Sequence, residues 1–203
     1  MAEHLWQDHF KQFDDDFGDN STTEVDVLSG PEDVQMLRGP DGSQWIAESG
    51  DYQFKLTIED GAGVSLSDLV GRIQPLPYPY MRAAEEVSDP GEDGIAVYKD
   101  LNGATAHGGK GYINIISAFY ADELVIAHEA GHTLEQVATE DDGSIPSQWR
   151  DAIDSDGISV SPYGDANWWE DAAEFSKVYA VCLDEGSTTL DDLKTLSPNR
   201  FEL

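Results

Sequence analysis

The stretch LVIAHEAGHTLEQVA, Leu124 to Ala138, carries two histidines and a glutamate inside a run with helical periodicity. His128, Glu129 and His132 have the spacing H-E-x-x-H. Residues four apart lie on one face of a helix, so both imidazoles can bind one metal ion. Glu129 is rotated off that pair and can reach a water on the ion, as zinc-dependent hydrolysis requires. The alternative is an amphipathic helix whose two histidines face solvent.

The neighbouring stripe of this helix is apolar and should face the core. Gly131 lies in that stripe, although glycine in a helix interior costs about 1 kcal/mol relative to alanine. Its presence predicts that a strand or a second helix passes very close at this point.

Two histidines do not complete a zinc site, because catalytic zinc normally has three protein ligands and a water. A metzincin would place a third histidine at position 138, which is Ala138, so that class is excluded. The other histidines, His4, His9 and His107, have no helical context that links them to the motif. We therefore expect the third ligand to be a carboxylate.

The helix predicted after Asn167 offers three carboxylates: Glu170, Asp171 and Glu174. Glu170 and Glu174 are four apart and share a face, so one can bind metal while the other orients a ligand histidine. Asp171 is turned about 100° away. A purely structural interpretation is also open, because Asn167 with Glu170 matches a helix capping box.

HEAGH followed by SPYGDANWWEDAAEFSKVYA (161–180) resembles the gluzincins of the anthrax lethal factor catalytic-domain type, which include the Pro-Pro endopeptidases. In that family a tyrosine follows the HExxH helix, and a glutamate ligand comes later within an E-x-x-x-E helix. Here the corresponding residues are Tyr163 and Glu170, with Glu174 completing the pair. The resemblance spans roughly residues 50–203 and leaves residues 1–49 outside.

The resemblance implies one Zn²⁺ ion held by three ligands: His128, His132 and Glu170. It implies that Glu129 is the general base and that Glu174 supports a ligand histidine. Tyr163 would stabilise the oxyanion, which a phenol donor near developing negative charge can do. The alternative for Tyr163 is a loop residue that packs beside Pro162.

The rest of the chain predicts an α+β fold. Strand-like runs occur at 51–60, 94–100 and 111–117, and a glycine-rich loop joins the last two. Helical patterns dominate after the motif, and a small sheet followed by helices indicates the α+β class. The resemblance refines this to a zincin-like domain over 50–203, with a small mixed sheet, an active-site helix and a C-terminal helical subdomain. Residues 1–49 are acidic and turn-rich around short strand candidates such as Glu24–Leu28, and we interpret them as an appendage or as a β-rich entry segment.

The run GYINII suggests how a substrate would bind. As the edge strand of the active-site sheet, it would align an extended peptide by strand addition, with Tyr112, Asn114 and Ile116 on one face. The same run is also compatible with an ordinary inner strand. The predicted function is a zinc-dependent endopeptidase that hydrolyses extended segments of a peptide or protein substrate.

Net charge is the outlying property of the composition, since 41 acidic and 11 basic residues give a formal charge of −30. Three explanations fit: a solvated shell for high salt, mimicry of nucleic acid, or attraction to basic partners. Direct nucleic-acid binding is disfavoured, because no basic patch is present to neutralise phosphates. The competing function is an acidic binding or decoy protein with a structural or vestigial zinc site.

The sequence contains a single cysteine, Cys182, so no intrachain disulfide is expected. No secretory signal or membrane-spanning run is recognisable, so we expect no membrane insertion. The expected state is a monomer, located in the cytoplasm or exported by a non-classical route.

Overall fold

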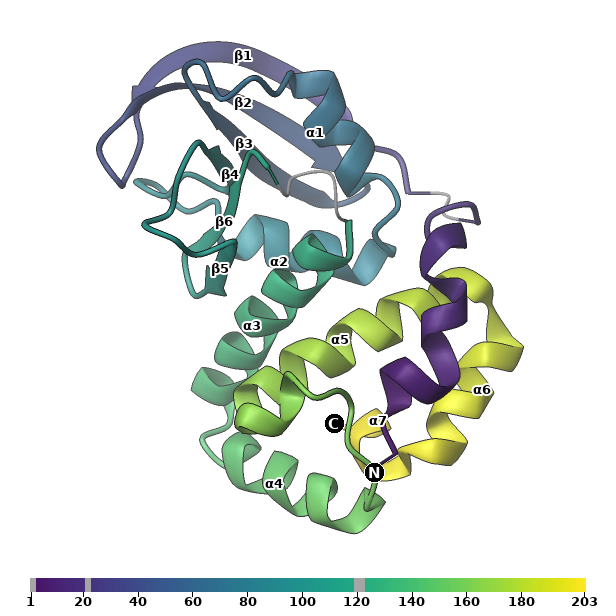
Figure 1. Cartoon of the computed structure of the whole chain (residues 1–203). Coiled ribbons are helices and arrows are strands. Elements are labelled where there is room, and N and C mark those ends of the chain that lie inside the picture. The colour runs from purple at the N-terminus through teal and green to yellow at the C-terminus, as the bar shows by residue number, and fades with distance from the viewer. Residues whose placement is uncertain (1–2, 21–22, 119–122) are drawn as a thin grey trace.

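The computed structural model describes residues 3–20, 23–118 and 123–203, which form an α+β fold with one mixed sheet (Figure 1). The strands are β1 (Asp26–Gln35), β2 (Asp41–Ser49), β3 (Tyr52–Glu59), β4 (Ile95–Tyr98), β5 (Ala106–Gly109) and β6 (Tyr112–Ile116). The helices are α1 (Leu66–Ile73), α2 (Met81–Glu86), α3 (Glu123–Asp141), α4 (Ile145–Asp156), α5 (Trp168–Glu185), α6 (Ser187–Leu196) and α7 (Pro198–Phe201). The α+β class expected from the sequence is confirmed.

The six strands lie in the order β1-β2-β3-β4-β6-β5. The first three form an antiparallel meander, β3, β4 and β6 run parallel, and β5 returns antiparallel to β6. The strands predicted at 51–60, 94–100 and 111–117 correspond to β3, β4 and β6. The sheet therefore ends at β5, next to the helix that carries the histidines.

Helices α1, α2 and α3 share one hydrophobic core with the sheet. Helix α1 begins at a capping box in which Ser65 and Asp68 satisfy each other's backbone amides. Its buried residues Leu69 and Ile73 join Ile95 and Ile113 of the sheet and Ile126 of α3 in that core. The motif helix is thereby anchored by its apolar side, and its other side is left for the site.

A second hydrophobic core lies in the helical half formed by α4 to α7, and residues from the start of the chain belong to it. Leu5, Trp6 and Phe10 are buried there against α5 residues such as Val178. They lie in or beside two short consecutive helical turns, residues 6–16, which we call the N-terminal helical segment.

Residues 1–49 do not form a separate appendage, whereas the alternative interpretation, a β-rich segment, agrees with the two strands found there. The N-terminal helical segment packs on the helical half, and β1 and β2 are strands of the main sheet. The boundary expected after residue 49 falls inside a β-hairpin, where Ser49 pairs with Tyr52. Turn residues and acidic side chains concealed this, because an exposed edge strand such as β1 has little apolar alternation.

The glycine-rich loop expected between β4 and β6 contains β5, and this corrects the assignment of the sheet edge. GYINII, expected as the edge strand, is β6 and lies between β4 and β5. Gly108 explains the mistake, because glycine weakens a strand pattern but is required here by packing. A Cβ at Gly108 would lie 2.2 Å from the backbone oxygen of Glu129, so β5 lies directly on α3.

A buried ionic network connects the last helices. The guanidinium of Arg200 in α7 donates from Nε and Nη2 to the two carboxylate oxygens of Asp171 in α5, at 2.8 and 2.9 Å. It also contacts Asp156 at the end of α4, and Trp149 donates to Asp171 at 2.9 Å. Asp171 therefore has a structural role, in agreement with its predicted orientation away from Glu170 and Glu174. Within the described ranges, no helix is long and apolar enough to cross a membrane.

Candidate metal centre

The candidate site lies on α3, where β5 approaches from one side and α5 from another. Gly131 permits the second approach, because a Cβ there would stand 2.6 Å from the Cβ of Ser176 in α5. The close helix contact predicted from this glycine is confirmed. It brings the carboxylates of α5 within reach of the histidines of α3.

Three donor atoms from the two helices converge. Glu170 Oε2 lies 3.4 Å from His128 Nε2 and 3.3 Å from His132 Nε2. The two imidazoles are nearly perpendicular, with ring centroids 4.9 Å apart. Their side chains are only 11% and 12% exposed, which contradicts the alternative of a solvent-facing histidine pair.

The local structure around Glu170 distinguishes its two possible roles, which are capping of α5 and binding of a metal ion. Asn167 caps α5 by accepting from the Glu170 backbone amide at 2.9 Å, so the predicted cap exists. The Glu170 side chain does not complete the capping box and faces the imidazoles instead. Its Oε2 is buried and accepts no hydrogen bond of good geometry. Burial raises the pKa of this carboxyl, but the two imidazoles outweigh burial and bring the pKa down to about 2.

Glu129 is buried on the same helix, with 7% of its surface exposed. One of its carboxylate oxygens lies within 4.8 Å of the donor nitrogens of His128 and His132. Glu129 directly follows His128, so its side chain points about 100° away around the helix. It is therefore poorly placed to bind the same metal ion as the two histidines. Burial raises the pKa of Glu129, and the imidazoles act in the opposite direction. A carboxyl with a raised pKa is a suitable proton acceptor near neutral pH.

Glu174 lies behind His128, at the position predicted for a supporting carboxylate. Its Oε1 is 2.9 Å from His128 Nδ1. A carboxylate only accepts, so Nδ1 carries the proton and Nε2 is directed at Glu170. Burial lowers the pKa of His128, but Glu170 and Glu174 prevail and raise it to about 9. Lys177 donates to both oxygens of Glu174, at 2.8 and 2.9 Å.

Tyr163 lies at the rim of the site, in the loop that precedes α5. Its ring centroid is 5.7 Å from that of His128, and 59% of the residue is exposed. Burial raises the pKa of its hydroxyl, and the carboxylates of Glu170, Glu129 and Glu174 raise it further. The phenol is therefore protonated at neutral pH and available as a donor.

A cleft of about 640 Å³ opens beside His128 and Glu129. Its walls include Ala104 to His107, which enter and form β5, together with His128, Glu129 and Tyr163. Trp6 and Lys11 of the N-terminal helical segment also line it. The site thus lies between the sheet edge and the start of the chain.

The three residues expected to contact substrate lie elsewhere. Tyr112, Asn114 and Ile116 belong to the inner strand β6 and are absent from the described lining of the cleft. Ile116 packs with Tyr98 in a small core, and Asn114 is 5% exposed. The expectation was wrong because the true edge strand, β5, was taken for a loop.

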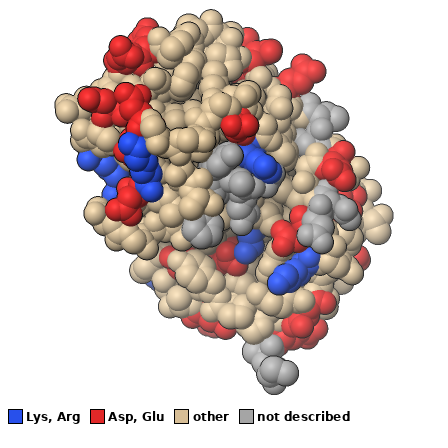
Figure 2. Space-filling model, turned by 45° about the horizontal axis from the view of Figure 1, so that its top comes forward, with Lys and Arg blue, Asp and Glu red and all other residues tan. Residues whose placement is uncertain are grey.

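Sequence reasoning also missed Lys177 and the residues of the N-terminal helical segment. Lys177 had a usable signal, because Glu174 and Lys177 are three apart and meet on one helix face. Trp6 had none, since its contact with α5 joins residues far apart in the sequence. Figure 2 shows acidic side chains spread over the visible face of the molecule.

Comparison of the chain with protein-family models, curated proteins and solved structures gave no match.

Proposed function

We propose that the protein is a zinc-dependent endopeptidase with His128, His132 and Glu170 as metal ligands. One observation carries the proposal. Two imidazole nitrogens and a buried carboxylate oxygen face one another at 3.3 and 3.4 Å, and the oxygen accepts no hydrogen bond of good geometry. A zincin-like fold of the gluzincin type remains part of this proposal and rests on the resemblance in sequence.

The spacing of these atoms fits a metal ion better than it fits an ion pair. Nitrogen and oxygen ligands lie about 2.0–2.2 Å from zinc, so two ligands at the tetrahedral angle stand about 3.3–3.5 Å apart. A hydrogen bond between imidazole and carboxylate would draw the atoms to about 2.8 Å. Two histidines and one carboxylate also leave a fourth position for water, as in catalytic zinc sites.

The reaction follows from the placement of the other groups. A bound zinc ion would acidify a water molecule and polarise the peptide carbonyl. Glu129 would take the proton from that water and pass it to the leaving amine. Tyr163 would donate to the oxyanion that forms, and Glu174 would hold His128 in its Nδ1–H tautomer.

The edge of β5 is the best candidate for aligning the substrate. It borders the cleft, and its outer side has no strand partner within the described chain. An extended peptide could pair with this edge by strand addition and cross above Glu129. The proposal of strand addition is therefore moved from β6 to β5.

Metal analysis and peptide turnover test the proposal together. The wild-type protein should contain about one zinc per chain and cleave members of a peptide library. A Glu170→Ala variant should lose zinc. Asp171→Asn also disturbs α5 but lies outside the proposed site, so this control should retain zinc. Chelator should abolish cleavage, and zinc should restore it. Purified protein that binds no zinc would contradict the proposal.

The same experiment addresses the acidic binding protein, which the charge of −30 favours. A decoy would bind a basic protein tightly at low salt and cleave no peptide, with or without zinc. Turnover that is lost in chelator excludes that alternative, whereas zinc content alone does not.

A further inference from the structure

The N-terminal helical segment reaches the proposed metal ligand His128 through two side chains. The ammonium nitrogen of Lys177 lies 4.8 Å from the centre of the Trp6 ring, within the range of a cation–π interaction. The same nitrogen binds both oxygens of Glu174. Glu174 in turn holds His128 Nδ1 at 2.9 Å. An unbroken chain of contacts therefore runs from residue 6 to the candidate metal centre.

Each member of this chain is held in place. Trp6 is 7% exposed, and its backbone amide donates to Val160 at 2.9 Å, in the loop that leads to Tyr163. The Lys177 side chain is 16% exposed, so its ammonium has exchanged most of its water for the indole face and Glu174. Long lysine side chains lose considerable rotamer freedom when fixed in this way, and such a conformation needs specific partners.

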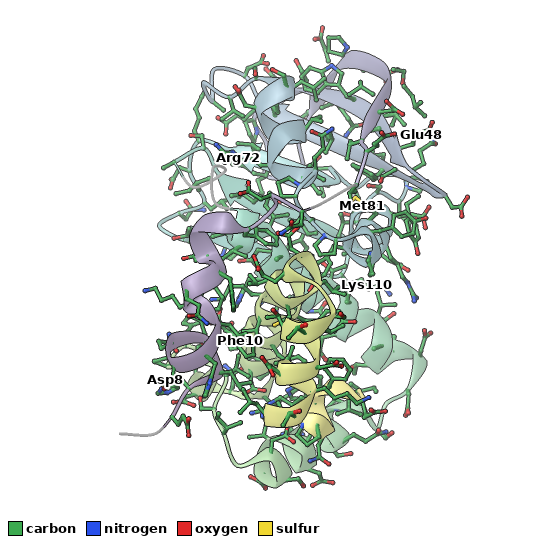
Figure 3. The ribbon with its side chains drawn as sticks, turned by 90° about the vertical axis from the view of Figure 1, so that its right-hand side faces the viewer. Asp8, Phe10, Glu48, Arg72, Met81 and Lys110 are labelled. Carbon is green, nitrogen blue, oxygen red and sulfur yellow. The ribbon has the colours of Figure 1, made fainter. Side chains whose placement is uncertain are left out.

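The segment that carries Trp6 also lies against the hydrophobic side of the helical half. Figure 3 shows Phe10 between the N-terminal helical segment and the C-terminal helices, whereas Asp8 points outward. Phe10 is 2% exposed and belongs to the same core as Trp6. The two aromatic residues thus share a structural role, but only Trp6 has a ring contact with Lys177 among the interactions described for the two.

We propose that Trp6 and Lys177 are positioning residues of the metal centre, and that the N-terminal helical segment contributes to the site through Trp6. Trp6 fixes Lys177, Lys177 fixes the carboxylate of Glu174, and Glu174 fixes the direction of His128 Nε2. This inference rests on the proposed zinc site and adds to it two residues that are not metal ligands.

The direct test substitutes Trp6 and leaves every charge in place. Residues that orient a metal-bound histidine typically influence metal affinity about 10–100-fold. Trp6→Leu should therefore weaken zinc binding about tenfold, measured by competition with a chromophoric chelator. Trp6→Phe keeps an aromatic face and should give an affinity between those of wild type and Trp6→Leu. The visible spectrum of the Co²⁺-loaded protein should shift or broaden in the same order.

Phe10→Leu is the matched control, because it removes a buried aromatic ring from the same segment and the same core. It should lower stability like Trp6→Leu, yet leave zinc affinity and the Co²⁺ spectrum unchanged. Equal zinc affinities for Trp6→Leu and Phe10→Leu, with identical spectra, would overturn the inference.

Two further outcomes of these experiments lead to different conclusions. If Trp6→Leu does not fold, Trp6→Phe and Lys177→Met decide: the inference predicts an altered Co²⁺ spectrum for both, and unaltered spectra refute it. If the wild-type protein binds neither Zn²⁺ nor Co²⁺, the proposed function fails first, and the inference falls with it.

Discussion

At the scale of single residues, Glu129 and Glu170 show how the environment divides two chemically identical side chains. Both are glutamates beside the same imidazoles. Burial dominates at Glu129, and its pKa is raised. At Glu170 the imidazoles outweigh burial, and the pKa falls to about 2. Glu170 is thus a permanent anion suited to a cation, whereas Glu129 is suited to proton transfer.

This difference predicts the phenotype of Glu129→Gln. The amide is nearly isosteric but cannot accept a proton, so peptide turnover should fall about 10²–10⁴-fold. Zinc content should stay at the wild-type level, since Glu129 is not among the proposed ligands. Glu135→Gln, on the same helix, is the control and should keep its activity. Wild-type turnover by Glu129→Gln would refute the assigned proton acceptor.

At the scale of elements, the closeness of α3 and α5 sets the geometry of the site. Gly131 was recognised in the sequence because glycine is unfavourable in a helix without a packing reason. The structure supplies that reason in Ser176 and Ala173 of α5. Glycine at position 131 is thus explained by the contact between two helices and not by the local helix preference of the residue.

Alanine substitutions at two helical glycines should therefore have opposite effects on stability. Gly131→Ala forces its new Cβ against Ser176, and such overpacking costs about 1–3 kcal/mol, more than the helix preference of alanine returns. Gly71→Ala in α1 meets no atom within 4 Å and should stabilise the protein by about 0.5–1 kcal/mol. Urea unfolding of both variants measures the difference. A stabilised Gly131→Ala would show that α3 and α5 are not in close contact.

The elements also show how far the sequence predicts this structure. The sequence pattern located α3, α5, β3, β4 and β6, because these carry an apolar face or, as in β4, a continuous apolar run. It failed at β5, where glycine was needed for contact with α3, and it indicated only the start of β1, which is largely exposed. Spacing within helices brought out His128 and His132 and made Glu170 and Glu174 candidates for the third ligand, and the resemblance to a family selected Glu170. Trp6 and the β5 wall escaped, because contacts between distant segments leave no local pattern.

At the scale of the whole molecule, the ionic network around Arg200 closes the helical half. Asp156 accepts from the Arg200 backbone amide and from Ser197, which joins the end of α4 to the start of α7. Burial raises the pKa of Asp156, but these hydrogen bonds prevail and lower it below its usual value. A lowered pKa in the folded state stabilises the protein above the unfolded pKa, and this stabilisation is lost as the pH falls through the folded value.

Asp156→Asn should therefore destabilise the protein by about 3 kcal/mol near neutral pH, because it leaves part of a buried cation uncompensated. The difference from wild type should shrink as the pH falls from the ordinary aspartate pKa of about 3.9 through the lower pKa that Asp156 has in the folded protein. Asp154→Asn, an exposed position on the same helix, is the control and should be nearly neutral. Urea unfolding across the pH range measures both variants. A constant difference at all pH values would contradict the role of the charge.

The charge of −30 should make the stability of the entire molecule depend on salt. Raising NaCl from about 0.05 M to about 1 M shortens the Debye length from about 14 Å to 3 Å and screens the repulsion. The free energy of unfolding in urea should rise accordingly. Near the sequence pI of 4.1 the net charge vanishes, and this salt effect should largely disappear. Equal salt effects at both pH values would point to something other than charge repulsion.

The path of the chain also bears on synthesis. Phe10 and Leu193 are buried in one hydrophobic core, although more than 180 positions separate them. The N-terminal helical segment therefore reaches its final surroundings only after the chain has been made as far as Leu193. Since Trp6 belongs to the wall of the cleft, a nascent chain carries an unfinished site. The proposed metal centre would gain its support from Trp6 only after α5 and α6 have been made.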